Sequence, residues 1–312
     1  MPHPTAAPTT PLPVRHGVSA SCLVLPSSRQ PLWPSLLDAL AERLPHINRA
    51  TWAQRLAHGD VVDAQGQPLQ ADSPPHSGQR VHYWRHVAQE PYLPFAHTVL
   101  YQDAHLVVAD KPHFVPVTPS GPYVQSSLLV RLKRELGLPD LSPLHRIDRD
   151  TAGLVVFAVR PADRNAYQAL FRDRQVHKVY EAVAPRPTPP WRGPQVRRSR
   201  LVEDEAFFCM REVAGEPNSE THLQWLADVP GADLSLYRLE PVTGKRHQLR
   251  VHMAALGLPI AHDVFYPTVT RGPKEPDDHP RPLQLLARRL AFTDPITGAA
   301  RRFESGLRLA LA

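Results

Sequence analysis

The sequence predicts an α+β fold with a mixed, largely antiparallel sheet and flanking helices. Strand-like segments follow one another at residues 99–102 and 105–110, and again at 221–227 and 234–240. They lack the strict alternation of strand and helix that is typical of a parallel sheet. The continuous apolar run at residues 154–159 indicates a further, buried strand. With 42% hydrophobic residues, the chain of 312 residues has enough apolar side chains for a substantial core.

Cap and turn residues delimit three helices in this part of the chain. Residues 126–136 and 243–256 are each followed by a glycine, which favours the end of a helix, and Thr243 can cap the start of the second. A helix over 161–174 would begin at proline, which suits a first helical position. We also expect a strand at 176–184 and a Pro- and Arg-rich loop at 185–200.

Three regions are predicted along the chain. Residues 1–14 are rich in Pro, Thr and Ala without periodicity, which favours a disordered tail. Residues 15–90 form a small N-terminal module, and residues 91–312 form the main domain. Within the module, helices are expected at 36–44 and 49–58 and strands at 61–62 and 80–85.

Composition narrows the class of protein. The net charge of +6 suits a polyanionic partner, although many basic proteins bind no nucleic acid. Cys22 and Cys209 are too few for a disulfide framework and lack metal-ligand spacing. No stretch approaches the roughly twenty apolar residues that span a bilayer, and the N-terminus lacks the apolar core of a signal peptide. We therefore expect a cytoplasmic monomer without a membrane partner.

A charged run precedes the predicted strand at 154–159. Asp148 lies between Arg146 and Arg149, whose charges would favour the ionised carboxylate. At the mouth of a strand, such a carboxylate can meet a ligand as nucleophile or base. A solvated loop with surface ion pairs is the alternative, because charged loops are common.

This run resembles the His-Arg-Leu-Asp-x-x-Thr-Ser-Gly motif of the RluA-type pseudouridine synthases. Further stretches resemble the family's other motifs in the same order, and the resemblance covers roughly residues 95–310. The matching stretches are Asp110-Lys111-Pro112, His145-Arg146-Ile147-Asp148-Arg149-Asp150-Thr151-Ala152-Gly153-Leu154, Lys178-Val179-Tyr180, Thr243-Gly244-Lys245-Arg246-His247-Gln248-Leu249-Arg250-Val251-His252, Gly257-Leu258-Pro259-Ile260-Ala261-His262-Asp263 and the strand Leu283-Gln284-Leu285-Leu286-Ala287-Arg288-Arg289-Leu290-Ala291-Phe292.

The resemblance implies a pseudouridine synthase fold and an isomerase that converts uridine in RNA to pseudouridine without a cofactor. It implies that Asp148 is the catalytic nucleophile or base, that Arg250 pairs with it, and that the ring of Tyr180 packs on the flipped base. From the residues alone, Tyr180 could equally be a core residue. Arg246 and Arg250, four residues apart, could be a pair of solvated arginines.

Substrate contacts follow from the same resemblance. It implies that Arg146 fills the gap left by the flipped uridine, although a structural ion pair with Asp148 or Asp150 is an alternative. Lys178 is expected to contact the substrate. Three further substrate contacts, at the start of the predicted helix, could bind phosphates: Lys245, Arg246 and His247. Lys245 stands where the family usually has arginine, so a bidentate phosphate contact is not expected there.

The N-terminal module resembles a degenerate S4 RNA-binding module. The order helix, helix, strand, turn, strand supports this, together with the segments Trp52-Ala53-Gln54-Arg55-Leu56-Ala57-His58-Gly59-Asp60-Val61 and Ser77-Gly78-Gln79-Arg80-Val81. A structural appendage that binds no RNA is the alternative.

We therefore predict an RNA pseudouridine synthase that acts on structured RNA, either ribosomal or transfer RNA. One alternative is a catalytically silent RNA-binding protein of the same fold. Another is a glycosidase that hydrolyses nucleosides, but the paired carboxylates that such enzymes commonly use are not evident. We expect no metal site, because His247 and His252 are five residues apart and do not share one helical face.

Overall fold

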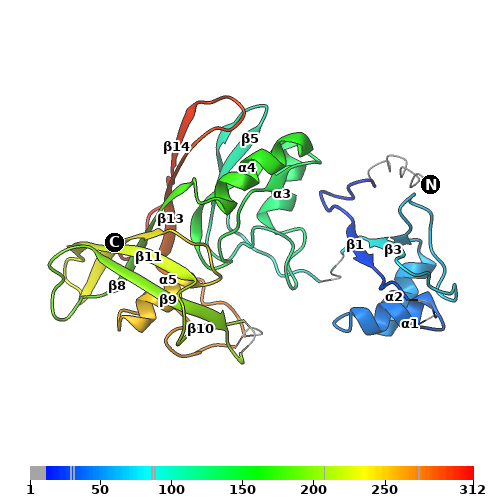
Figure 1. Cartoon of the computed structure of the whole chain (residues 1–312), viewed down its shortest axis with the longest axis horizontal. Helices are drawn as coiled ribbons and strands as arrows, with labels where there is room; N and C mark the ends of the chain where they lie inside the picture. Colours follow the sequence, from blue (N-terminus) through cyan, green and yellow to red (C-terminus); the bar gives the residue numbers. More distant parts are fainter. Residues whose placement is uncertain are drawn as a thin grey trace. The chain divides into compact units, whose positions relative to one another are not determined.

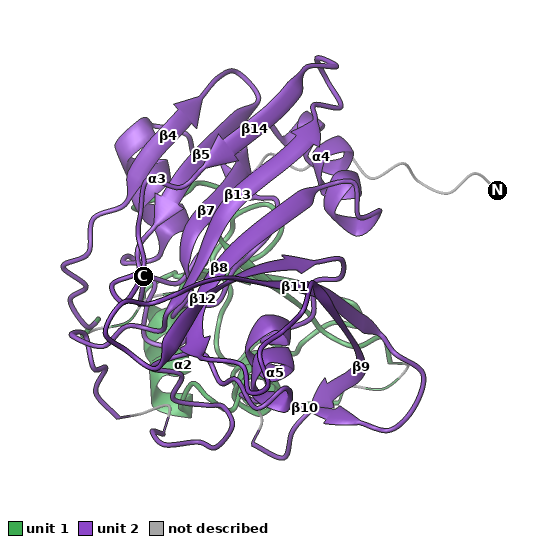
Figure 2. Cartoon of the chain, turned by 90° about the vertical axis from the view of Figure 1, so that its left-hand side faces the viewer, with its two compact units in different colours: residues 1–90 green, residues 91–312 purple. Residues whose placement is uncertain are grey.

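The computed structural model describes residues 12–28, 30, 32–85, 87, 89–206, 208–272 and 275–312 (Figure 1). The chain divides into two compact units, Met1–Glu90 and Pro91–Ala312, which Figure 2 colours separately. The predicted disordered tail lies outside the described residues up to position 11. Pro13, also within that predicted tail, accepts a hydrogen bond from Trp84 Nε1 at 3.0 Å. No helix in the described ranges is long and apolar enough to cross a membrane.

The first unit packs two helices against a three-stranded antiparallel sheet of order β1-β3-β2. Ser35 and Asn48 cap the two helices by accepting hydrogen bonds from backbone N–H groups in the first turn. Leu40, Trp52 and Val81 are fully buried in its core. The elements are β1 (Ser21–Val24), α1 (Leu36–Arg43), α2 (Arg49–Ala57), β2 (Val61–Val62) and β3 (Arg80–Tyr83). Strand β1 was not predicted, and the likeness to an S4 module remains a prediction.

The second unit is built on an 11-stranded mixed sheet. Its central path runs β10-β9-β11-β12-β8-β13-β7-β5-β4, while β14 pairs with β13 and β6 with β7. Among the described strands only β13 and β7 pair in parallel. The sheet is thus mixed and largely antiparallel, as predicted. The strands are β4 (Thr98–Gln102), β5 (Leu106–Lys111), β6 (Ser142–Pro143), β7 (Ala152–Ala158), β8 (His177–Pro185), β9 (Gln195–Glu203), β10 (Met210–Val213), β11 (Ser219–Asp228), β12 (Leu234–Pro241), β13 (Leu285–Thr293) and β14 (Ala300–Glu304).

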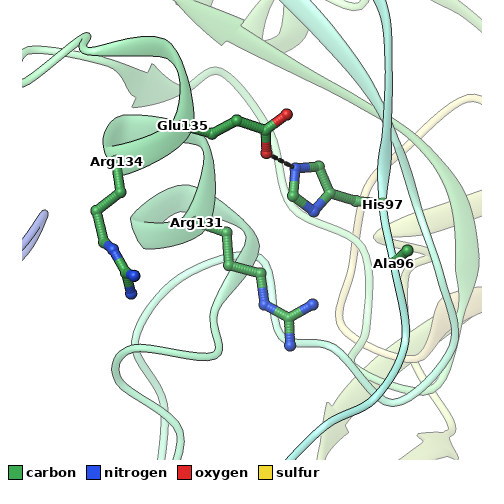
Figure 3. Close-up of a pocket in the computed structure, with 5 residues that line it drawn as sticks. All are labelled: Ala96, His97, Arg131, Arg134 and Glu135. Carbon is green, nitrogen blue, oxygen red and sulfur yellow. Dashed lines mark ion pairs between the residues drawn. The ribbon is translucent and has the colours of Figure 1, made fainter.

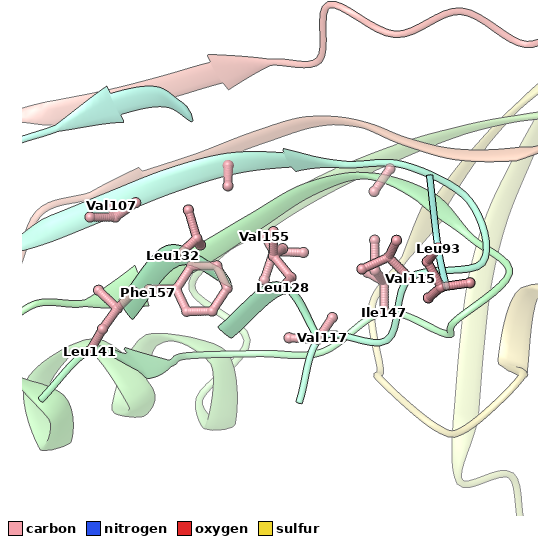
Figure 4. Packing of buried hydrophobic residues seen from close by; sticks show 12 residues of the cluster. Leu93, Val107, Val115, Val117, Leu128, Leu132, Leu141, Ile147, Val155 and Phe157 are labelled. Atoms are coloured by element: carbon pink, nitrogen blue, oxygen red, sulfur yellow. The ribbon is translucent and has the colours of Figure 1, made fainter. Parts of the chain in front are cut away.

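Helices cover both faces of the sheet at β5 and β7. Because side chains alternate along a strand, Val107, Val155 and Phe157 face α3 (Leu128–Leu136), as Figure 4 shows. The intervening residues, among them Val108 and Val156, face α4 (Arg164–Arg172). This double burial explains why both strands are apolar along most of their length. Pro161 starts a 3-10 turn (Pro161–Asp163) that leads into α4.

Two sequence expectations are wrong. Residues 185–200, predicted as a loop, contain the first part of β9, which carries arginines at positions 197, 198 and 200. Arg197 pairs across the sheet with Glu212, and Arg198 with Glu220, so charged side chains contribute to the pairing of this strand. Thr243 does not cap the following helix: α5 (Gln248–Ala255) begins after His247, and the Thr243 hydroxyl donates to Gln248 Oε1 at 2.6 Å.

Candidate active site

A short loop between β6 and β7 carries Asp148 out of the sheet. The backbone pairing with β7 extends as far as Leu144, whose N–H donates to the Val156 carbonyl oxygen. The Val156 N–H in turn donates to a side-chain atom, His145 Nε2, at 3.1 Å. The His145 ring stacks on Phe171 at 4.7 Å. Desolvation, reinforced by the charge of Lys178, lowers the pKa of His145 to about 3, so the ring stays a neutral acceptor. Ile147 then packs into the core, and Asp148 is left partly exposed.

Glycine is required where this loop joins the sheet. Gly153 has φ +111°, and a Cβ at this position would lie 2.3 Å from the carbonyl oxygen of Ala287 on β13. The parallel pairing of β7 with β13 therefore needs a residue without a side chain. This close approach places the motif that follows Asp148 at the centre of the sheet.

All eight predicted site residues line one cavity of about 1050 Å³. They come from the Asp148 loop, from β8, from the segment that leads into α5 and, for Arg250, from α5 itself. The residues are Arg146, Asp148, Lys178, Tyr180, Lys245, Arg246, His247 and Arg250. Residues more than a hundred positions apart in the sequence thus meet at one place.

Arg250 is held by the carboxylate of Asp263, a partner that the sequence analysis did not predict. Its Nε and Nη2 donate to Asp263 at 2.7 and 2.6 Å, and both side chains are 1% exposed. Arg250 Nη1 lies 3.8 Å from Asp148 Oδ2, which is an ion pair but not a hydrogen bond. Burial alone would lower the pKa of Arg250, but the hydrogen bonds and charge of Asp263 raise it overall. The guanidinium is therefore a fixed, permanent charge beside Asp148.

Tyr180 lies on β8 and is partly buried beside the same carboxylate. Its removal from water, together with the negative charge of Asp148, raises the pKa of its hydroxyl. The phenol therefore stays protonated at neutral pH and can donate a hydrogen bond. Tyr180 packs against the core at the cavity wall, so its core and cavity interpretations are both consistent with the structure.

The two arginines beside Asp148 do not pair with it, contrary to the expectation from the charged run. Arg149 Nη1 and Nη2 each donate to Asp277 at 2.7 Å, and Nη2 lies 3.1 Å from Asp150. Arg146 is exposed and forms no ion pair or hydrogen bond within the described ranges. The alternative of a structural ion pair at Arg146 is therefore wrong, and its guanidinium is available to a ligand.

The remaining predicted contacts divide into two groups. Lys245 and Arg246 are exposed at the cavity mouth, and Arg246 Nη2 donates to the Cys209 carbonyl at 3.1 Å. Lys178 lies deeper, where burial and then the charge of Arg174 lower the pKa of its ammonium. His247 is turned inward, with Nε2 3.9 Å from Asp148 Oδ2. Its contact with a phosphate stays a prediction.

Lys111 and Asp277 support the Asp148 loop, Asp277 through its hydrogen bonds with Arg149. Lys111 is fully buried at the end of β5, and its Nζ donates to the carbonyl oxygens of Pro112 and Arg149 at 3.0 and 2.9 Å. Burial lowers the pKa of Lys111 to about 7, against the opposing charges of Asp150 and Asp148. The Asp-Lys-Pro motif was a signal for Lys111, whereas no sequence pattern pointed to Asp277.

A second cavity, of about 550 Å³, lies at the start of the unit and contains none of these residues. Its lining includes His97, which pairs with Glu135 at 2.9 Å (Figure 3). Arg131 on α3 donates to the carbonyl oxygens of Phe95 and Leu93 at 2.6 and 3.0 Å. This arginine therefore fastens the segment before β4 to the unit. The described residues contain no group of three or more His, Cys, Asp or Glu side chains suited to a metal ion.

Solved structures similar to this chain include two human proteins with an RNA pseudouridylate synthase domain. Human RNA Pseudouridylate Synthase Domain Containing 4 superposes with a TM-score of 0.52 at 28% identity, covering 68% of this chain and 88% of that one. Human RNA Pseudouridylate Synthase Domain Containing 1 has a TM-score of 0.56 at 22% identity, covering 70% of this chain and 86% of that one, and shows likeness of fold alone.

Sequence relatives identify the family. The family model described as RNA pseudouridylate synthase matches residues 105–255, which include all eight predicted site residues. The Dual-specificity RNA pseudouridine synthase RluA of Haemophilus influenzae is 32% identical over 230 residues, or 69% of this chain and 94% of the relative. A Synechocystis protein named Uncharacterized RNA pseudouridine synthase slr1592 is 28% identical over 244 residues, covering 74% of this chain and 79% of the relative. The chain therefore belongs to the RluA-type RNA pseudouridine synthases and is an isomerase.

Proposed function

We propose that this enzyme isomerises specific uridines in structured RNA, ribosomal or transfer RNA, and that Asp148 is its catalytic nucleophile or base. The observation that carries the proposal is the meeting of Asp148, Tyr180 and Arg250 at one cavity, with a buried charge beside the carboxylate. A cavity of about 1050 Å³ is large enough for a flipped nucleotide.

The reaction rearranges bonds without redox change. The N1–C1′ bond of uridine breaks, the uracil rotates, and a C5–C1′ bond forms; C5 loses a proton and N1 gains one. Asp148 either attacks the sugar or removes a proton from it as the base leaves. Arg250, fixed by Asp263, places a positive charge beside the carboxylate of Asp148. Because the reaction needs no electron carrier, the proposal includes no cofactor.

The other cavity residues are assigned to RNA binding and base flipping. Tyr180 offers an aromatic face to the extruded uracil. Arg146, which is exposed and has no polar partner among the described residues, is placed to occupy the gap in the RNA. Lys178, Lys245 and Arg246 provide positive charge along the path of the backbone. The first unit is proposed to add RNA contacts, and the enzyme to act as a cytoplasmic monomer.

Tritium release from RNA labelled at uridine C5 tests the activity. Isomerisation releases the label into water, hydrolysis of the glycosidic bond gives free uracil, and a silent RNA-binding protein gives neither. We expect release from a subset of uridines only. Mapping pseudouridines in total RNA with and without the gene then identifies the target, and an unchanged map would contradict the proposal.

A further inference from the structure

His247 occupies a strained backbone position that its surroundings hold in place. Its φ of +52° and ψ of +15° lie in the left-handed region, which is unfavourable for a residue with a side chain. Its ring lies nearly parallel to Phe265 at 5.9 Å and edge-on to Tyr266 at 5.6 Å. These contacts keep the imidazole at the cavity wall instead of in solvent.

A chain of hydrogen bonds sets the direction of the ring. The Tyr266 hydroxyl accepts the Met210 backbone N–H at 2.8 Å, and the same hydroxyl lies 2.8 Å from His247 Nδ1. The hydroxyl proton is therefore available to Nδ1, which favours the neutral tautomer with its proton on Nε2. Burial, the largest effect, lowers the pKa of His247 and keeps the ring neutral at neutral pH.

The ring nitrogen Nε2 points at one oxygen of the catalytic carboxylate. It lies 3.9 Å from Asp148 Oδ2, and Arg250 Nη1 lies 3.8 Å from the same oxygen. In the part of the chain that the structure describes, Asp148 Oδ1 has no hydrogen bond or ion pair. Both separations exceed hydrogen-bond length, but catalytic hydrogen bonds often tighten only in the complex with substrate.

We propose that His247 is a positioning residue, which together with Arg250 holds Asp148 Oδ2 and so leaves Oδ1 to react with the sugar. This role differs from the phosphate contact expected from the sequence, and it rests on the function proposed for Asp148. Two donors on one oxygen restrict rotation of the carboxylate, and a misplacement of about 1 Å can lower an enzymatic rate about a hundredfold.

Two substitutions separate the hydrogen-bond donor from the shape of the ring. His247→Phe keeps an aromatic ring against Phe265 but lacks the N–H, whereas His247→Gln provides an amide N–H near the position of Nε2. We expect the single-turnover rate of tritium release at saturating enzyme to fall about 10- to 100-fold in His247→Phe, with RNA affinity changed less than about threefold. His247→Gln should recover a large part of the rate. His222→Phe, at an exposed histidine of β11, is the matched control and should retain the wild-type rate.

The outcomes distinguish this inference from the function on which it rests. A wild-type protein that releases no tritium refutes the proposed function. If the wild type is active, any of three results overturns the positioning role. These are a His247→Phe variant as fast as the wild type, a His247→Gln variant no faster than His247→Phe, and a loss that is confined to RNA affinity. If His247→Phe does not fold, Tyr266→Phe answers the same question, because it retains the histidine but removes the partner of Nδ1. A wild-type saturated rate in Tyr266→Phe would then overturn the inference.

Discussion

Replacing Asp263 by asparagine tests the buried ion pair that supports the site. The Asp263 carboxylate accepts two hydrogen bonds from Arg250, and its Oδ1 also accepts the backbone N–H groups of Phe265 and Tyr266 at 2.9 and 3.2 Å. The asparagine side chain in Asp263→Asn would be neutral and would turn an NH₂ group toward one of these donors. Because the guanidinium of Arg250 is sealed from water, it cannot recover its hydration.

The expected loss follows from the burial of the pair. Removing one partner of a buried ion pair costs about 3–5 kcal/mol. A domain of about 150–250 residues loses roughly 2–4 °C of Tm per kcal/mol, so the unit Pro91–Ala312 should melt roughly 6–20 °C lower. Scanning calorimetry of the full chain measures this shift. Asp173→Asn, which breaks an exposed pair with Arg172, is the control and should leave Tm unchanged. A shift below about 2 °C for Asp263→Asn, or one equal to the control, would refute the reasoning.

Three further predictions concern binding, catalysis and pH. Arg250→Lys should lower the single-turnover rate at saturating enzyme, because lysine cannot reproduce the bidentate contact with Asp263, whereas Arg146→Ala should mainly impair base flipping. Single-turnover rates and the fluorescence of 2-aminopurine placed beside the target uridine distinguish the two effects. Normal base flipping in Arg146→Ala would contradict the role assigned to Arg146. Deleting residues 1–90 should weaken RNA affinity and flatten its salt dependence more than it slows the reaction of bound RNA. If the truncated protein folds and keeps its RNA affinity but loses its rate at saturating enzyme, the first unit does not serve to bind RNA. Because the pKa of Lys111 is lowered to about 7, its side chain binds fewer protons in the native state than in the unfolded state between pH 7 and about 10. The free energy of unfolding should therefore rise in this range by up to about 1.4 kcal/mol per pH unit. Urea titrations at several pH values should show a smaller rise per pH unit in Lys111→Met, and an equal rise would contradict the lowered pKa of Lys111.

Sequence patterns predicted those features that depend on neighbouring residues. The apolar runs of β5 and β7 predicted strands, because a strand between two helical layers has few polar positions. The residues that meet at the cavity were implied by the family resemblance of their motifs and not by local sequence patterns. Strand β9 was missed because prolines precede it and because its arginines are satisfied by glutamates on other strands.

Long-range side-chain pairing could not be predicted from the sequence. Arg149 lies next to Asp148 in sequence, yet it pairs with Asp277, which is 128 residues away. Arg250 forms an ion pair with Asp148, as the resemblance implied, but its two hydrogen bonds to Asp263 were not predicted. Each choice depends on the direction of a side chain within the folded unit, which sequence spacing does not specify.

The most direct measurement of the central claim is tritium release by Asp148→Asn at saturating enzyme, with RNA binding measured on the same preparation. The amide keeps the size of the carboxylate but loses its charge and nucleophilicity. We predict that binding persists while the rate falls by several orders of magnitude, because the neutral amide can act neither as the nucleophile nor as the base. Residual activity above about a tenth of the wild-type rate would contradict the catalytic role of Asp148.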